Sequence, residues 1–258
     1  MGKSDKPLMR YSTSEMAKDV IELLDHVGWD ADRQIHVSGV SMGGMIAQEL
    51  AFLIPERICS LNLFSTAAKV ENTTTFLENM QTRIRMFLPK TLENSIHESS
   101  ETLFSEKWLS SPDDTNVPTA SSPNVEMPES GEYGMFSTNM ERFAAQEICK
   151  RLDTEQYGSK GFFLQLIAAA WHHKSPEQLK KIGDQVGRER IMVVHGAEDR
   201  MITAPHGKKL ISYLKPSVGI VVEGIGHVFM VENSKYHIEL IETMVNKCEA
   251  MKESSERI

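Results

Sequence analysis

Three residues whose types cooperate in acyl transfer stand far apart in this chain, in the order Ser41, Asp199, His227. A serine hydroxyl is a weak nucleophile at neutral pH and needs a base within hydrogen-bond reach. The base in turn needs a carboxylate that fixes its tautomer and stabilises its imidazolium form. The three residues therefore predict nucleophilic catalysis, provided that the fold brings them together. Their surroundings are Gly39-Val40-Ser41-Met42-Gly43, Gly196-Ala197-Glu198-Asp199-Arg200 and Gly224-Ile225-Gly226-His227.

The stretch around Ser41 indicates a strand, a sharp turn and a helix. A β-leaning run at Ile35–Ser38 precedes the turn, and apolar residues at helical spacing follow it. We expect the turn to hold Ser41 in a strained backbone conformation, with Gly39 and Gly43 removing Cβ atoms that would collide. The following helix N-terminus favours an oxyanion, and the Met42 amide is the expected first donor to it.

Each of the other two roles has rivals. Glu198 stands beside Asp199 as an alternative carboxylate. Among the histidines, His36 and His195 lie on expected strands and are interpreted as core residues, and His206 as the start of a helix. His227 is distinguished by the glycines that precede it at the end of an expected strand.

Composition narrows the class of protein. The chain has 258 residues, a formal net charge of −8 and three widely separated cysteines. The net charge argues against a nucleic-acid partner, and the odd cysteine count argues for a reducing compartment. We find no membrane-length apolar run and no signal peptide, so a soluble cytoplasmic protein is expected. No metal-ligand spacing and no phosphate-binding glycine loop appears, so neither a metal nor another cofactor is implied.

Strand-like and helix-like segments alternate at both ends of the chain, which predicts an α/β fold with a doubly wound, mainly parallel sheet. Loops at the carboxyl ends of such strands build the site. The expected strands are Ile35–Ser38, Ile58–Phe64, Ile191–His195 and Val218–Val222. The expected flanking helices run from a capping box at Ser12 to Gly28, over Ala204–Leu214, and over Ser234–Met251.

Residues 70–184 lack a convincing strand, and we interpret them as a helical cap inserted into a core formed by residues 1–69 and 185–258. Within the insertion, residues 110–134 are rich in proline and serine and predict a mobile loop. Helices are expected around Thr74–Phe87, Met140–Leu152 and Gly161–Trp171. The residues considered for a substrate pocket are Trp171, His172 and Met230.

The nucleophile turn, the stretch from Val193 to Asp199 and the Gly224–His227 motif together make the chain resemble the α/β-hydrolase fold enzymes, over nearly its whole length. The strongest similarity is to small esterases, lactonases and cofactor-free haloperoxidase-like members. The resemblance implies a serine hydrolase that cleaves a small carboxylic ester, lactone or thioester. Ser41 would be the nucleophile, His227 the base and Asp199 the acid.

The start of the chain departs from the family pattern. Residues 2–7 resemble the end of a loop that follows the fourth strand in the family, so the first strands and the His-Gly loop that supplies a second oxyanion amide are expected to be absent. One missing donor costs about a hundred- to a thousandfold in rate. The first strand would also form an exposed edge that favours homo-oligomers. A competing interpretation is therefore a hydrolase-like protein that binds a ligand or partner with weak or lost catalysis.

Overall fold

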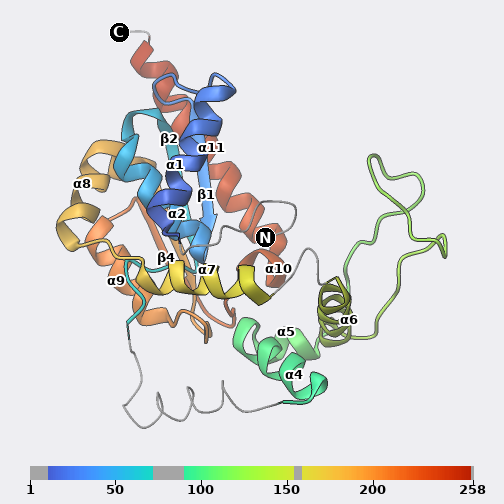
Figure 1. Ribbon diagram of the computed structural model, residues 1–258. Coiled ribbons are helices and arrows are strands. Elements are labelled where there is room, and N and C mark those ends of the chain that lie inside the picture. Colours follow the sequence, from blue (N-terminus) through green and yellow to red (C-terminus); the bar gives the residue numbers. More distant parts are fainter. Residues whose placement is uncertain (1–10, 72–89, 154–158, 257–258) are drawn as a thin grey trace.

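A parallel four-stranded sheet forms the centre of the protein. The computed structural model describes residues 11–71, 90–153 and 159–256 (Figure 1). The strand order is β1-β2-β3-β4, and every neighbouring pair is parallel. This confirms the predicted fold class and the predicted strands. The strands are β1 (Ile35–Val40), β2 (Ile58–Phe64), β3 (Ile191–Gly196) and β4 (Val218–Val222).

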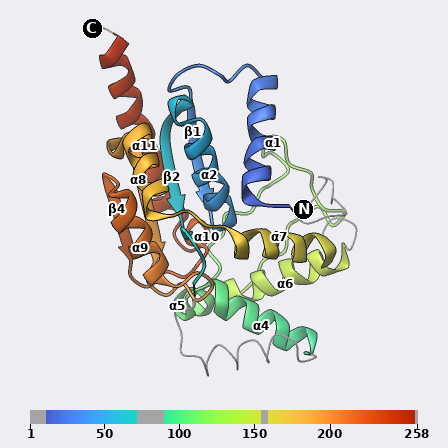
Figure 2. The ribbon, with the colours of Figure 1, turned by 60° about the vertical axis from the view of Figure 1, so that its left-hand side comes forward.

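Helices cover both faces of the sheet (Figures 1 and 2). Every residue of β2 and β3 is buried, as expected for central strands of a parallel sheet that is covered on both faces. One face packs on α1 (Thr13–His26), α2 (Met42–Leu53), α8 (Pro176–Val186) and α9 (Ala204–Leu214). The other packs on α10 (Phe229–Glu232) and α11 (Ser234–Glu256). Short 3-10 turns, η1 (Pro55–Arg57) and η2 (Arg188–Arg190), precede β2 and β3.

The first helix begins where its capping signal predicts. The Ser12 side chain accepts a hydrogen bond from the Glu15 amide, and the Glu15 carboxylate accepts one from the Ser12 amide. The helix ends before Gly28, whose φ of 74° is a conformation that glycine adopts without strain.

The regular elements described within the inserted region are all helices. They are α4 (Leu92–Leu103), α5 (Glu106–Ser110), α6 (Asn139–Leu152) and α7 (Ser159–Trp171). Together, α4 to α7 form the cap. Figure 1 shows α4, α5 and α6 grouped beyond one end of the strands, and these helices share a small apolar core of Ile96, Phe104, Leu109 and Phe143. The helix predicted at Thr74–Phe87 lies outside the described residues.

One helix of the predicted insertion belongs to the core. Leu179, Ile182 and Val186 of α8 are fully buried in the cluster that covers the sheet. Helix α8 therefore packs with the sheet, and the predicted division of the chain at residue 184 stays a prediction. Residues 111–138 connect α5 to α6 without a helix or strand. The mobility predicted for residues 110–134 stays a prediction.

Two further expectations concern the outer surfaces. Strand β1 pairs only with β2, so it is an edge of the described sheet, and self-association through it stays a prediction. Within the described ranges, no helix has both the length and the apolar character that a bilayer span needs.

Candidate active site

Ser41 occupies the turn between β1 and α2. Its φ of 54° and ψ of −122° lie outside the ordinary regions for a residue with a side chain, as expected for a strained nucleophile turn. Two contacts hold this conformation: the Ser41 amide donates to the Phe64 carbonyl at 3.0 Å, and the Thr66 hydroxyl donates to the Ser41 carbonyl at 2.7 Å. The strain is therefore supported by the end of β2.

The glycine requirement of this turn differs in part from the prediction. A Cβ at Gly39 would lie 2.4 Å from the Gly43 carbonyl oxygen, so Gly39 is required as predicted. A Cβ at Gly43 would meet nothing within 4 Å, so the predicted collision there was wrong. The second crowded position is Gly44, where a Cβ would lie 2.7 Å from the Thr66 side chain because α2 packs closely on the end of β2.

Asp199 lies in the loop after β3 and is almost fully buried. Its Oδ1 accepts hydrogen bonds from the Met201 amide at 2.9 Å and the Ile202 amide at 2.8 Å. Its Oδ2 lies 2.8 Å from Nδ1 of His227. Burial alone would raise the pKa of Asp199, but hydrogen bonds from His195 and His227 outweigh it and hold that pKa below its usual value. The carboxylate therefore stays ionised at neutral pH.

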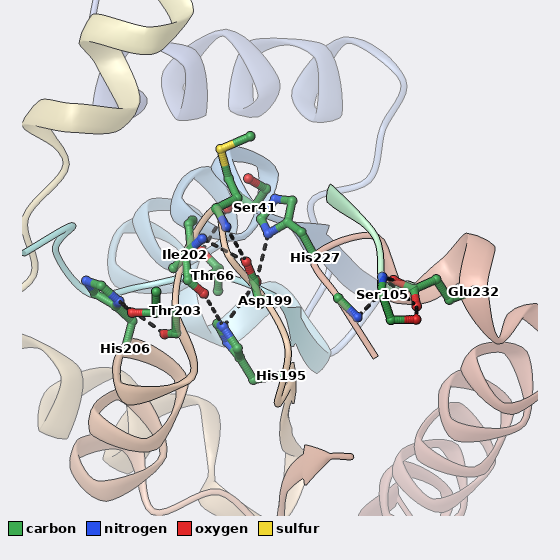
Figure 3. Close-up of polar contacts among 12 residues, drawn as sticks. Ser41, Thr66, Ser105, His195, Asp199, Ile202, Thr203, His206, His227 and Glu232 are labelled. Carbon is green, nitrogen blue, oxygen red and sulfur yellow. Dashed lines mark hydrogen bonds and ion pairs between the residues drawn. The ribbon is translucent and has the colours of Figure 1, made fainter. Parts of the chain in front are cut away.

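His227 follows β4, and its ring contacts the Asp199 carboxylate. The contact with Asp199 orients its ring and leaves Nε2 as the nitrogen available to a hydroxyl group. Figure 3 shows the imidazole between Asp199 and Ser41. The fold thus brings together the three residues that the sequence placed at strand ends. Met42 is the first residue of α2, so its amide has no acceptor within the helix and suits the predicted oxyanion contact.

Comparison with known proteins gives the family. The profile of the alpha/beta hydrolase fold family matches residues 1–234. The chain belongs to the α/β-hydrolase fold family.

Individual members resemble it over different lengths. The 3-oxoadipate enol-lactonase 2 of Acinetobacter baylyi is 39% identical over 69 residues, which are 27% of this chain and 25% of that protein. The chain aligns with only 17% to 39% of the length of the curated relatives it matches.

Two solved structures show the same fold. Est816, described as an enzyme that degrades N-acyl homoserine lactones, superposes with a TM-score of 0.66 at 19% identity, covering 94% of this chain and 78% of its own. A thermophilic esterase from Thermogutta terrifontis gives a TM-score of 0.61 at 17% identity, covering 96% and 77%.

Sequence reasoning missed the contact that His195 makes in this α/β-hydrolase fold. Its Nε2 lies 2.6 Å from the Ile202 carbonyl oxygen and 3.2 Å from Oδ2 of Asp199. Because the carbonyl accepts only, Nε2 carries the proton and faces both acceptors. One usable signal was present in the sequence: His195 lies at the end of β3 four residues before the acid, at the edge where the site forms.

A second missed feature joins the cap to the loop of the base. The Leu103 carbonyl, at the end of α4, accepts hydrogen bonds from the His227 amide at 2.8 Å and the Val228 amide at 3.2 Å. Beside it, the half-buried Glu232 carboxylate accepts from the Ser105 hydroxyl at 2.5 Å and from the Gly226 amide at 2.8 Å (Figure 3). The cap therefore helps to fix the backbone of the loop that carries His227. No local motif encodes these contacts.

A cavity of about 1060 Å³ lies within the cap, lined mainly by residues of α4, α5 and α6. Arg200, which follows Asp199, also lines it and donates to the Glu101 carbonyl of α4 at 3.1 Å. The three residues considered for a substrate pocket do not line this cavity. Trp171 is 66% exposed, Met230 is half-buried three residues after His227, and His172 is buried. Their role in a pocket stays a prediction.

His172 takes part in a separate polar cluster. Its Nδ1 lies 2.9 Å from the Thr13 hydroxyl and 3.5 Å from the Glu49 carboxylate on α2. Glu49 also forms a buried ion pair with Lys174. Burial lowers the pKa of His172, and the carboxylate opposes that change. These contacts join α1, α2 and the segment between α7 and α8.

Proposed function

We propose that this chain is a serine hydrolase that cleaves a small carboxylic ester, lactone or thioester through an acyl-enzyme. The observation that carries the proposal is the 2.8 Å contact between Nδ1 of His227 and the buried Asp199 carboxylate, beside a serine in the strained turn. The names of relatives add support, because an enol-lactonase, a homoserine-lactone-degrading enzyme and an esterase all act on such acyl bonds.

The proposed reaction has two halves, acylation of Ser41 and hydrolysis of the acyl-enzyme, and both use the same residues. The Ser41 oxygen attacks the acyl carbon while Nε2 of His227 takes the hydroxyl proton. The Met42 amide stabilises the resulting oxyanion, and the imidazolium gives its proton to the leaving oxygen or sulfur. In the second half, His227 takes a proton from water, the hydroxide attacks the acyl-enzyme, and Ser41 leaves with the proton. Asp199 keeps the ring oriented and its charge compensated throughout.

Burst hydrolysis of p-nitrophenyl acetate and p-nitrophenyl butyrate tests this proposal. We expect a rapid release of about one nitrophenolate per chain, followed by slower turnover, since acylation and deacylation are separate steps. Ser41→Ala should abolish the burst. Ser212→Ala, at an exposed position on α9, serves as the matched control and should retain it.

A serine-directed fluorophosphonate probe gives a second measurement that does not depend on turnover. Labelling of the parent chain and of Ser212→Ala, but not of Ser41→Ala, would support an activated Ser41. A folded parent chain that shows neither a burst nor labelling would contradict the proposal and favour a ligand-binding member of the family.

A further inference from the structure

Three potential metal ligands meet at the end of the sheet opposite the catalytic residues. His36 lies on β1, Cys59 on β2 and Glu249 on α11. One ligand atom from each, the imidazole nitrogen, the sulfur and a carboxylate oxygen, lies within 4.8 Å of the other two. His36 precedes Ser41 by five residues on an extended strand, which corresponds to roughly 16 Å. The cluster is therefore separate from the triad.

An irregularity in the strand pairing turns Cys59 toward this cluster. Ile35 pairs with Ile58, but His36 pairs with Ser60, so the register shifts and Cys59 is the extra residue. Strict alternation would place Cys59 and Ser60 on opposite faces. The shift instead places the Cys59 side chain in the apolar cluster beneath α11, on the face where Ser60 contacts His36. Such bulges redirect a side chain at the cost of a regular ladder.

The His36 ring is held with Nε2 directed at the other two ligands. Its Nδ1 lies 2.8 Å from the Ser60 hydroxyl, which also accepts from the Asn62 amide group at 3.3 Å. Its Nε2 lies 2.7 Å from the Glu249 carboxylate. Metal-binding histidines commonly use one nitrogen for the ion and the other for an orienting hydrogen bond.

The sulfur is buried and the other two ligands are reachable from solvent. The side chains of His36 and Glu249 are 24% and 44% exposed, which gives an ion a path to the buried thiol. The Cys59 thiol donates to the Glu249 carboxylate oxygen, 3.7 Å from the sulfur, so the metal-free protein holds a thiol there. Arg190 Nη1 lies 3.7 Å from the sulfur and is anchored on the carbonyls of Cys59 and Cys248. It is placed to donate to a thiolate.

We propose that His36, Cys59 and Glu249 bind a divalent zinc-type cation, with water as the fourth ligand. Mixed nitrogen, sulfur and oxygen ligands suit Zn²⁺ and exclude a preference for Mg²⁺ or Ca²⁺. On binding, the Cys59 thiol releases its proton to water, so that the thiolate and the carboxylate balance the two charges of the ion.

The required movement is small. Tetrahedral Zn²⁺ with bonds of about 2.0 to 2.3 Å separates its ligand atoms by about 3.3 to 3.6 Å. The carboxylate now lies 2.7 Å from the nitrogen and 3.7 Å from the sulfur. The nitrogen and the sulfur lie within 4.8 Å of each other, so shifts of roughly 1 Å in the partly exposed His36 and Glu249 side chains bring the three ligand atoms to these separations. Bound metal would fasten the edge strand β1 to β2 and to α11.

Titration of the full chain with Co²⁺ and then Zn²⁺ tests the site without reference to catalysis. We expect one Co²⁺ per chain, a thiolate-to-cobalt charge-transfer band, displacement of that band by Zn²⁺, and a higher Tm with Zn²⁺. Cys59→Ser should abolish the band, and Cys149→Ser, at the exposed cysteine, should retain it.

Two variants at accessible positions keep the proposal testable if Cys59→Ser does not fold. His36→Gln and Glu249→Gln should each weaken binding at least about tenfold. His26→Gln and Glu242→Gln, at exposed positions on α1 and α11, should bind as the parent does. A folded parent without the band, a band that depends on Cys149, or unchanged affinity in both His36→Gln and Glu249→Gln would overturn the proposal.

Discussion

Two buried carboxylates in this protein each lie close to a histidine, but their surroundings give them different roles. Asp199 is 3% exposed and Glu49 is 5% exposed. The Asp199 carboxylate is held by two backbone amides and two imidazoles, on a loop at the carboxyl end of the sheet. The Glu49 carboxylate lies within α2 and is paired with the Lys174 ammonium and close to His172.

The two carboxylates differ in whether their main partner can exchange a proton. An imidazole can gain and lose a proton near neutral pH, so a carboxylate beside it can support proton transfer. Glu49 instead forms a buried ion pair with the Lys174 ammonium group, so that pair fixes structure. A buried carboxylate next to a histidine therefore indicates chemistry only where its other partners leave the imidazole free to titrate and a nucleophile lies on its far side.

The largest expected effect is on the catalytic rate, and it should distinguish Asp199 from Glu49. In Asp199→Asn, the amide oxygen can still accept from Met201 and Ile202, but the amide cannot stabilise an imidazolium. We expect kcat for p-nitrophenyl butyrate to fall about 10⁴-fold with little change in Tm. A loss of less than tenfold in steady-state kinetics would contradict the assigned role of Asp199.

The second effect should appear in stability instead. Glu49→Gln leaves the Lys174 ammonium buried without its counter-charge, so we expect a loss of about 3 kcal/mol in the free energy of unfolding. The rate per folded chain should stay within a few-fold of the parent. Urea unfolding measures the loss, with Glu56→Gln at an exposed position as control. Equal stability of the two variants would remove the distinction between the carboxylates.

Acid titration gives a related test of Glu49. Burial opposes ionisation, but hydrogen bonds from His172 and Lys174 lower the pKa of Glu49 from 4.5 to about 2. Because the folded-state pKa is the lower one, this stabilisation is complete above about pH 4.5 and is lost as the pH falls toward 2. The parent should therefore lose up to about 3 kcal/mol over this range that Glu49→Gln does not lose. Parallel stability curves would show that Glu49 makes no such contribution.

The smallest effect concerns His195, which acts on the reaction through Asp199. His195→Leu removes the proton shared between Asp199 and the Ile202 carbonyl, and we expect kcat to fall roughly tenfold as the acid becomes less well positioned. His195→Gln keeps an N–H donor and should recover part of the rate. A less hydrogen-bonded Asp199 carboxylate is more basic, so the acid limb of the kcat/KM profile should move to higher pH. An unchanged profile would assign His195 a structural role alone.

Apolar runs made the sheet predictable. Strands β2 and β4 and helix α9 have the bounds that the sequence indicated, because mainly apolar residues and a clear helical stripe define them locally. The cap helix α4 was missed since only Ile96 and Ser100 of it are buried, which leaves little periodicity. Helix α8 was also missed, although Ser175 and Gln178 form a capping box that could have revealed it.

The candidate site was predictable to the extent that strand ends define it. Ser41, Asp199 and His227 each follow a strand, and parallel topology brings such positions to one edge. Contacts between distant segments left no such trace. Two examples are the hydrogen bonds that the Leu103 carbonyl accepts from the His227 loop and the contact between His36 and Glu249. Both depend on packing that no single stretch of sequence encodes.

The Leu103 contact also constrains how the cap can evolve. Its acceptor is a backbone carbonyl, which every amino acid supplies, so substitutions along α4 can accumulate without disturbing the alignment of His227. A change in length is different. Inserting or deleting one residue turns the end of a helix by about 100°, and the carbonyl then points elsewhere. Substitutions in α4 should therefore be neutral for the alignment of His227. Insertions and deletions in α4 should be removed by selection.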